Sequence, residues 1–187
     1  MDALMAALVL GAITQASDRT PWLAAILADR LGRATTIVAL VLALAANYAI
    51  GVVAGLTVAA FLTPEAKLLL LALALVLAGL GTGWRVARPE TLARWRLPGP
   101  VTAFLGLFIM AFGDRMQFVV AALAARTDLP WAAAVGATLG AALVGAAAAT
   151  MGERAWLALP LRGVRIGAGI VLTLAGVVMG LSAVRLI

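Results

Sequence analysis

Two residue types are missing from this chain of 187 residues: cysteine and histidine. Without cysteine there is no disulfide and no thiolate site, and without histidine there is no imidazole ligand. Zinc, copper and iron–sulfur chemistry therefore lose their usual ligands. An enzyme is not expected either, because no polar cluster outside the motifs described below offers both a nucleophile and a base.

Charged residues are also scarce. They make up 12% of the chain, against 65% hydrophobic residues, and the mean hydropathy is +1.12. A soluble domain of this size cannot sustain such a composition, so the sequence predicts an integral membrane protein. The net charge of +6 comes from basic residues that stand singly in short connections. Nucleic-acid binding requires a clustered basic patch, so no nucleic-acid partner is expected.

Apolar runs of about 17 to 25 residues, bounded by charge or proline, predict membrane-spanning helices. The first run has neither a basic region nor a cleavage signature, and we interpret it as a retained first span. A polar connection over residues 85–100 carries Glu90 and Arg94 at a spacing that predicts a short surface helix. Six runs fit the criteria: about 3–28, 34–62, 68–83, 101–125, 131–151 and 164–184.

The basic residues predict the orientation of these spans. Three fall in the second and fourth connections or at the C-terminal end: Lys67, Arg126 and Arg185. Nine fall in the first, third and fifth connections: Arg30, Arg33, Arg85, Arg88, Arg94, Arg96, Arg154, Arg162 and Arg165. Because the more basic side faces the cytoplasm, we expect the central connection inside and both termini outside.

The same charged dipeptide interrupts two of the predicted spans. QASDRT places Asp18 and Arg19 in the first span, and AFGDRMQ places Asp114 and Arg115 in the fourth. The residues after each dipeptide also align, with an aromatic residue, alanine, leucine and a final arginine in common. The chain therefore resembles two copies of one three-helix unit.

The repeat predicts an architecture. Residues 1–84 form the first three-helix half, residues 85–100 a cytoplasmic connection, and residues 101–187 the second half. Because each half has an odd number of spans, the halves must be upside down relative to each other, as in many secondary transporters. The predicted fold is an all-α integral membrane protein of six transmembrane helices in two inverted three-helix repeats.

Inversion brings the two motifs together near the middle of the membrane, where oxygen ligands are concentrated. Carboxylates, amides and free carbonyls suit calcium, magnesium or manganese. Pro21 cannot donate to the carbonyl of Ser17, which frees that oxygen. The candidate metal ligands are Asp18, Asp114, Gln15, Ser17 and Gln117.

A structural role is the alternative, since an aspartate and an arginine in a membrane can simply pair. Neighbours in a helix point about 100° apart, so pairing across the repeats, Asp18 with Arg115 and Asp114 with Arg19, is the better geometry. Asn47 either lines the path or bonds between helices. The residues expected in ion pairing or gating are Arg19, Arg115, Thr20 and Asn47.

These motifs resemble those of the transmembrane protein 165 / Gdt one family of cation/proton antiporters (uncharacterised protein family 0016). In that family each half carries glutamate, a hydrophobic residue, glycine, aspartate, a basic residue and a hydroxyl residue. The matching positions are Asp18, Arg19, Thr20, Gly113, Asp114 and Arg115. The departures are Gln15 and Ala111 for the two glutamates, Ser17 for the first glycine, and Met116 for the second hydroxyl residue.

The resemblance implies a bacterial inner-membrane transporter that moves Mn²⁺ or Ca²⁺ in exchange for protons at Asp18 and Asp114. A desolvated carboxylate holds a proton more readily, which lets proton and metal compete. No tightly bound cofactor is expected, and the small residues of the fifth span are compatible with a monomer or a homodimer. Two alternatives stay open: an exporter of a small organic solute, and a non-transporting membrane protein that keeps the motifs for structure.

Overall fold

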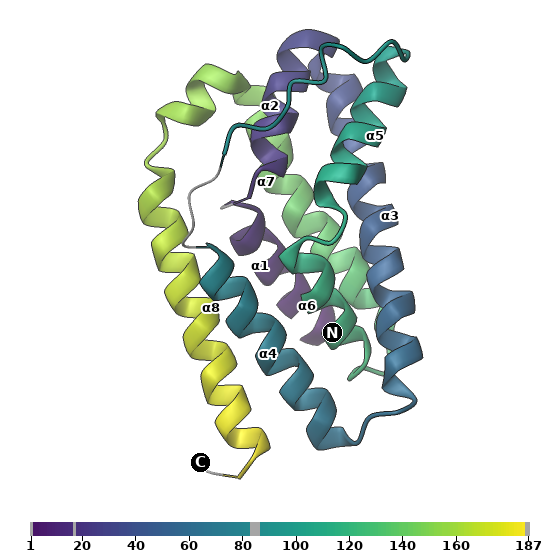
Figure 1. Cartoon of the computed structure of the whole chain (residues 1–187), viewed down its shortest axis with the longest axis vertical. Helices are drawn as coiled ribbons and strands as arrows, with labels where there is room; N and C mark the ends of the chain where they lie inside the picture. Colours follow the sequence, from purple (N-terminus) through teal and green to yellow (C-terminus); the bar gives the residue numbers. More distant parts are fainter. Residues whose placement is uncertain (1, 17, 83–86, 186–187) are drawn as a thin grey trace.

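The computed structural model describes residues 2–16, 18–82 and 87–185, and over these ranges the chain is all-α, as predicted. No strand occurs among the described residues. Figure 1 shows the helices, several of which run side by side. Their bounds are α1 Asp2–Gln15, α2 Thr20–Leu31, α3 Arg33–Ala59, α4 Pro64–Thr82, α5 Gly99–Ala111, α6 Arg115–Ala124, α7 Pro130–Ala158 and α8 Leu161–Ala183.

Four of the described helices are long and apolar enough to cross a membrane: α3, α4, α7 and α8. Helices α5 and α6 together make a fifth candidate span, bent by 71° between them. Helix α1, with 14 residues, is apolar but shorter. Length and composition of the described helices thus support a multi-pass membrane protein with four or five spans, where the sequence predicted six.

The prediction of continuous first and fourth spans was wrong, because each is broken at its charged motif. Helix α1 ends at Gln15 before α2 begins at Thr20, and α5 ends at Ala111 before α6 begins at Arg115. At the second break Gly113 has a φ of 72°, a left-handed conformation that glycine adopts without strain. The motifs therefore lie in irregular backbone between short helices, with Pro21 in the first turn of α2.

The central connection contains no helix between residues 87 and 98, so the predicted surface helix was wrong. Prolines at 89 and 98 and a left-handed φ of 55° at Leu92 oppose helix formation there. Arg88 forms an ion pair of 2.9 Å with Glu153 of α7, and Arg30 of α2 donates to the carbonyl of Thr91. The first, third and fifth connections therefore meet at one end of the bundle.

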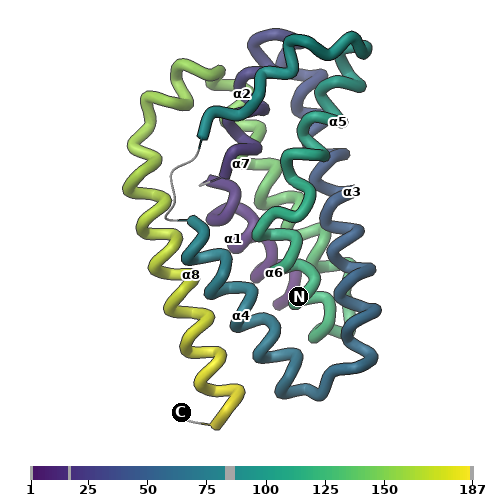
Figure 2. Tube along the Cα trace, in the orientation of Figure 1, coloured from purple at the N-terminus to yellow at the C-terminus, as the bar shows by residue number. Residues whose placement is uncertain are grey.

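The described helices divide into a core and an attached pair. In the core, α7 packs against α1, α2 and α3, and α3 packs in turn against α5 and α6. Helix α8 packs extensively against α4, which also contacts α6, and Figures 1 and 2 show this pair along one edge of the molecule. A Cβ added at Gly79 would lie 2.7 Å from the carbonyl oxygen of Gly169, so the backbones of α4 and α8 approach closely.

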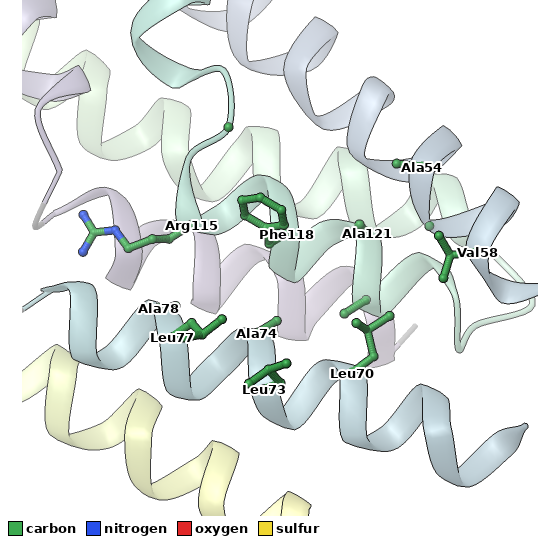
Figure 3. A pocket seen from close by; sticks show the side chains of 13 residues that line it. Ala54, Val58, Leu70, Leu73, Ala74, Leu77, Ala78, Arg115, Phe118 and Ala121 are labelled. Carbon is green, nitrogen blue, oxygen red and sulfur yellow. The ribbon is translucent and has the colours of Figure 1, made fainter. Parts of the chain in front are cut away.

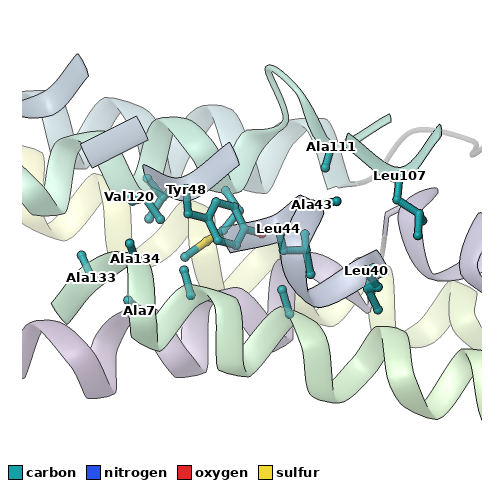
Figure 4. Packing of buried hydrophobic residues seen from close by; sticks show 14 of the residues in the cluster. Ala7, Leu40, Ala43, Leu44, Tyr48, Leu107, Ala111, Val120, Ala133 and Ala134 are labelled. Atoms are coloured by element: carbon teal, nitrogen blue, oxygen red, sulfur yellow. The ribbon is translucent and has the colours of Figure 1, made fainter. Parts of the chain in front are cut away.

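Buried apolar side chains fill the space around α3. Leu40, Leu44 and Tyr48 of α3 are fully buried, and Figure 4 shows them beside side chains of the neighbouring helices, such as Leu107 and Val120. Large apolar side chains also cover the outer faces, for example on α8, where Ile170 and Leu174 are exposed. An apolar exterior around a packed interior is the pattern that a bilayer favours.

Candidate functional site

Asp18, at the first helix break, has both carboxylate oxygens engaged. Its Oδ1 accepts from Arg115 Nη2 at 3.2 Å, and its Oδ2 accepts from the Thr20 hydroxyl at 2.9 Å. The side chains of Asp18 and Arg115 keep 19% and 25% of their surface exposed. The ion pair of Asp18 with Arg115 is the one that the sequence predicted, and the Thr20 hydroxyl shares the same carboxylate.

Arg115 makes a second contact that the sequence analysis did not anticipate. Its Nη1 donates to the hydroxyl of Thr82 at 2.9 Å, and that hydroxyl donates to the Ala78 carbonyl at 2.6 Å. The guanidinium thus joins the first helix break to α4. A lone threonine in an apolar run is too common to indicate such a role, so the sequence carried no signal for Thr82.

Asp114, at the second break, caps a helix instead of pairing with an arginine. Its Oδ1 accepts from the backbone N–H of Gln117 at 2.7 Å, and the Gln117 Oε1 accepts from the N–H of Gly113 at 2.6 Å. This reciprocal arrangement is similar to a capping box, for which Asp114 and Gln117 have the required spacing, except that Gln117 accepts from the residue before the N-cap. The amide oxygen of Gln117 is therefore occupied in this structure.

The expected pair between Asp114 and Arg19 is not formed. Arg19 is exposed and makes no ion pair with any residue in the described ranges. The physical reason is local: Arg19 precedes the first turn of α2 on the outside of the break, while one oxygen of Asp114 is committed to the helix cap. Only one of the two predicted cross-repeat pairs exists.

Asn47 of α3 links the second break to the core. Its side-chain Nδ2 donates to the carbonyl of Phe108 on α5 at 3.0 Å, and its backbone carbonyl accepts from Gln117 Nε2 at 2.9 Å. Asn47 was predicted either to line the transport path or to bond between helices, and it forms the interhelical hydrogen bond.

Three buried polar atoms near the breaks have no hydrogen-bond partner in the described part of the chain: Gln15 Nε2, Asn47 Oδ1 and the Tyr48 hydroxyl. Asn47 and Tyr48 are neighbours on α3, and the backbone carbonyl of Asn47 is bonded to Gln117 at the second break. Leaving such an atom unpaired costs about 1–3 kcal/mol. Unpaired buried polar atoms are therefore uncommon in folded proteins. The structure thus places polar side chains from both halves around one buried region.

A small pocket of about 90 Å³ reaches Asp18 from one end of the bundle. Its lining includes Trp22, Trp156 and Arg165 of α8. Trp22 donates from Nε1 to Glu153 Oε1 at 3.2 Å, and the same oxygen accepts from Arg88 Nη2. Asp18 is therefore approached from the end where the central connection lies.

The site offers little negative charge. Within the described ranges no group of three or more acidic side chains is close enough together to hold a metal ion. The two motifs contribute Asp18 and Asp114 against Arg19 and Arg115, a formal sum of zero. Ala111 is fully buried and has no ligand atom in its side chain, and Ser17 lies outside the described residues.

Comparison with known proteins identifies the second half of the chain. Residues 100–186, from α5 to the C-terminal end, match the family model described as divalent cation/proton antiporter GDT1. The second half of the chain belongs to the GDT1 family. The match includes the second break with Asp114 and Arg115, whereas Asp18 lies outside it. No curated protein and no solved structure matches the chain significantly.

The match to the GDT1 family agrees with the helices described above. A match to an antiporter family and several apolar helices of membrane length together support a multi-pass membrane protein.

Proposed function

We propose that this member of the GDT1 family exchanges a divalent cation, Mn²⁺ or Ca²⁺, for protons at a site between the two helix breaks. One observation carries the proposal. The ion pair between Asp18 and Arg115 joins the two motifs at 3.2 Å, so the carboxylate of the first motif and the guanidinium of the second meet at one place. Broken helices that meet in this way are where secondary transporters bind their ions.

The helix contacts support an inverted repeat of two three-helix halves. Each half has two short helices separated by a motif and then two long helices. The contact of α1 with α7 corresponds to that of α5 with α3, and the contact of α2 with α7 corresponds to that of α6 with α3. The contacts α3 with α7 and α4 with α8 join corresponding helices, as a two-fold axis between the halves would produce.

In the proposed site Asp18 is the principal ligand, because it is the carboxylate that the small pocket reaches. A cation bound there replaces Arg115, which holds Asp18 in this structure. Asp114 and Gln15 complete the site, while Gln117 shapes the second break through its helix cap. The carbonyl of Ser17 stays a sequence-based prediction.

We further infer the setting of the transporter. The more basic connections face the cytoplasm of a bacterial cell and both termini lie outside the inner membrane. On that orientation the pocket at Asp18 opens towards the cytoplasm. The cation is cargo, so the protein needs no resident cofactor, and a homodimer is compatible with the many small residues on its helices.

A structural role for the motifs is the second candidate. The observation that favours it is the same ion pair, because Arg115 neutralises Asp18 without any cation. In that case Asp18→Asn would mainly reduce stability, since removing one member of a pair leaves the other uncompensated.

The deciding experiment is cation flux in proteoliposomes under an imposed pH gradient. We expect uptake of Mn²⁺ or Ca²⁺ by the parent protein and no uptake by Asp18→Asn or Asp114→Asn, with each variant still monodisperse on size exclusion. Failure of the parent to move either ion would reject the proposal. An organic-solute exporter would instead show flux of a solute with no response to either metal.

A further inference from the structure

Helices α4 and α8 form a unit that is attached to the rest of the protein over a small area. Among the described helices, α8 packs extensively on α4 alone, and α4 meets the core mainly at α6. At the α4–α8 crossing a Cβ on Gly176 would lie 2.7 Å from the Ala72 carbonyl oxygen, so these two helices fit each other closely. The pair is therefore tightly joined internally and weakly joined to its surroundings.

An open groove of about 450 Å³ lies between α4 and the core. Leu73 and Leu77 of α4 line one side of it, and Phe118 of α6 and Val58 of α3 line the other. Figure 3 shows these side chains around the opening, with Arg115 at one end. Leu73, Leu77 and Phe118 are exposed, so the groove is open to the outer face and no packed side chains fix α4 against α3 there. The groove therefore leaves room for α4 and α8 to move as a unit.

The guanidinium of Arg115 connects this unit to the motif site. One nitrogen holds Asp18 in the core and the other holds Thr82 in the last turn of α4. The Thr82 side chain is buried, and its hydroxyl is oriented by its own bond to the Ala78 carbonyl. Among the described side chains, only this hydrogen bond ties α4 to a motif residue.

We propose that Thr82 is a positioning residue that holds Arg115 against Asp18 and thereby couples cation occupancy of Asp18 to the position of the α4–α8 pair. This inference rests on the proposed transport function. When a cation takes the place of Arg115 on Asp18, the guanidinium keeps its bond to Thr82, and its displacement is passed to α4. Without that bond Arg115 still leaves Asp18, but α4 and α8 do not respond.

The test replaces Thr82 by valine, which keeps the volume and removes the hydroxyl. A matched control is Thr36→Val, because Thr36 is also fully buried and its hydroxyl also donates to the carbonyl four residues earlier, Gly32, at 3.0 Å. We expect Thr82→Val to lower the maximal Ca²⁺ flux about tenfold, since a hydrogen bond to a charged group is lost. The half-saturating Ca²⁺ concentration should change little, and Thr82→Ser should restore the flux.

A second readout does not depend on transport. The chain has no cysteine, so spin labels can be placed at Val53→Cys on α3 and Val171→Cys on α8, both exposed on outer faces. We expect Ca²⁺ to shift the distance distribution between the labels in the parent and in Thr36→Val. In Thr82→Val the distribution should be broader and insensitive to Ca²⁺.

The outcomes separate the two proposals. A parent protein that moves no cation rejects the proposed function, whereas equal flux and equal distance distributions in Thr82→Val and Thr36→Val reject the role of Thr82. If the parent moves no cation, the label distances still decide whether Thr82 holds the α4–α8 pair, because the broadening expected for Thr82→Val without Ca²⁺ needs no transport.

Discussion

The two helix breaks carry the same dipeptide and use it differently. At the first break Asp18 binds Arg115 and Thr20 through its side chain and lies against a small pocket. At the second break Asp114 accepts a backbone N–H and fixes the start of α6. The arginines differ as well, since Arg115 bridges two parts of the protein while Arg19 is exposed.

The two copies of the motif therefore have different roles in the folded chain. A carboxylate that caps a helix is held in place by the backbone, so Asp114 is the fixed carboxylate of the proposed site. A carboxylate held only by side chains can exchange its partner, so Asp18 is the position at which we propose that a cation replaces Arg115. The fixed aspartate lies in the part of the chain that matches the family, and the exchangeable one lies outside it.

Asp18→Asn should have the largest effect of any single substitution. We expect cation binding and flux to be lost, because asparagine brings no charge to the position that the pocket reaches. The cost in folding stability should be only about 1 kcal/mol, since both members of the ion pair are partly exposed. Isothermal calorimetry, flux and thermal unfolding of the purified protein measure these quantities.

A control for Asp18→Asn is Asp29→Asn. The Asp29 carboxylate lies outside the proposed site and accepts the backbone N–H of Glu153 at 3.0 Å. Asp29→Asn should leave binding unchanged. A loss of several kcal/mol of stability in Asp18→Asn, with transport by the remaining folded protein intact, would assign the motif a structural role.

Two substitutions at Asp114 separate its charge from its helix cap. Asparagine caps helices about as well as aspartate, so Asp114→Asn should lose cation binding with little change in stability. Asp114→Ala should lose binding and also about 1 kcal/mol of stability, because the N–H of Gln117 loses its acceptor. Thermal unfolding and calorimetry on both variants check this. Retained binding in Asp114→Asn would show that the cap is the whole role of Asp114.

The sequence predicts the class of the protein, four of the six proposed spans and one of the two cross-repeat ion pairs. It missed the breaks, because a run of about 20 residues stays apolar on average when three or four of them leave the helix. A local signal was present in the spacing of Asp114 and Gln117, a capping box preceded by glycine in the middle of a span. Thr82 and Tyr48 could not be found, because a single polar residue in an apolar run has many ordinary explanations.

Restoring the family glutamates should strengthen the site. Gln15→Glu together with Ala111→Glu should raise Mn²⁺ affinity by about one to two orders of magnitude. Each added charge about 4 Å from a divalent ion contributes several kcal/mol at an effective dielectric near 20, partly offset by desolvation. Calorimetry and metal-dependent thermal shift measure the change.

Because Ala111 is fully buried, Gln15→Glu alone is the variant expected to keep the fold intact. It should give a smaller gain of the same sign. Unchanged Mn²⁺ affinity in both variants would mean that the cation does not bind between the two breaks, and the structural role of the motifs would then be favoured.

The smallest expected effect concerns the backbone of the second break. Gly113 has a φ of 72° and no neighbouring atom within 4 Å of an added Cβ, so Gly113→Ala meets only conformational strain and should cost about 1 kcal/mol. Gly163, in the first turn of α8, is equally open but has no positive φ, so Gly163→Ala should be neutral or stabilise by up to about 1 kcal/mol. Thermal unfolding of the two variants compares the same methyl group in the two backbone conformations. Equal effects of the two alanines would mean that the left-handed turn at Gly113 does not separate α5 from α6 in the folded protein, and the comparison of the two breaks would lose its basis.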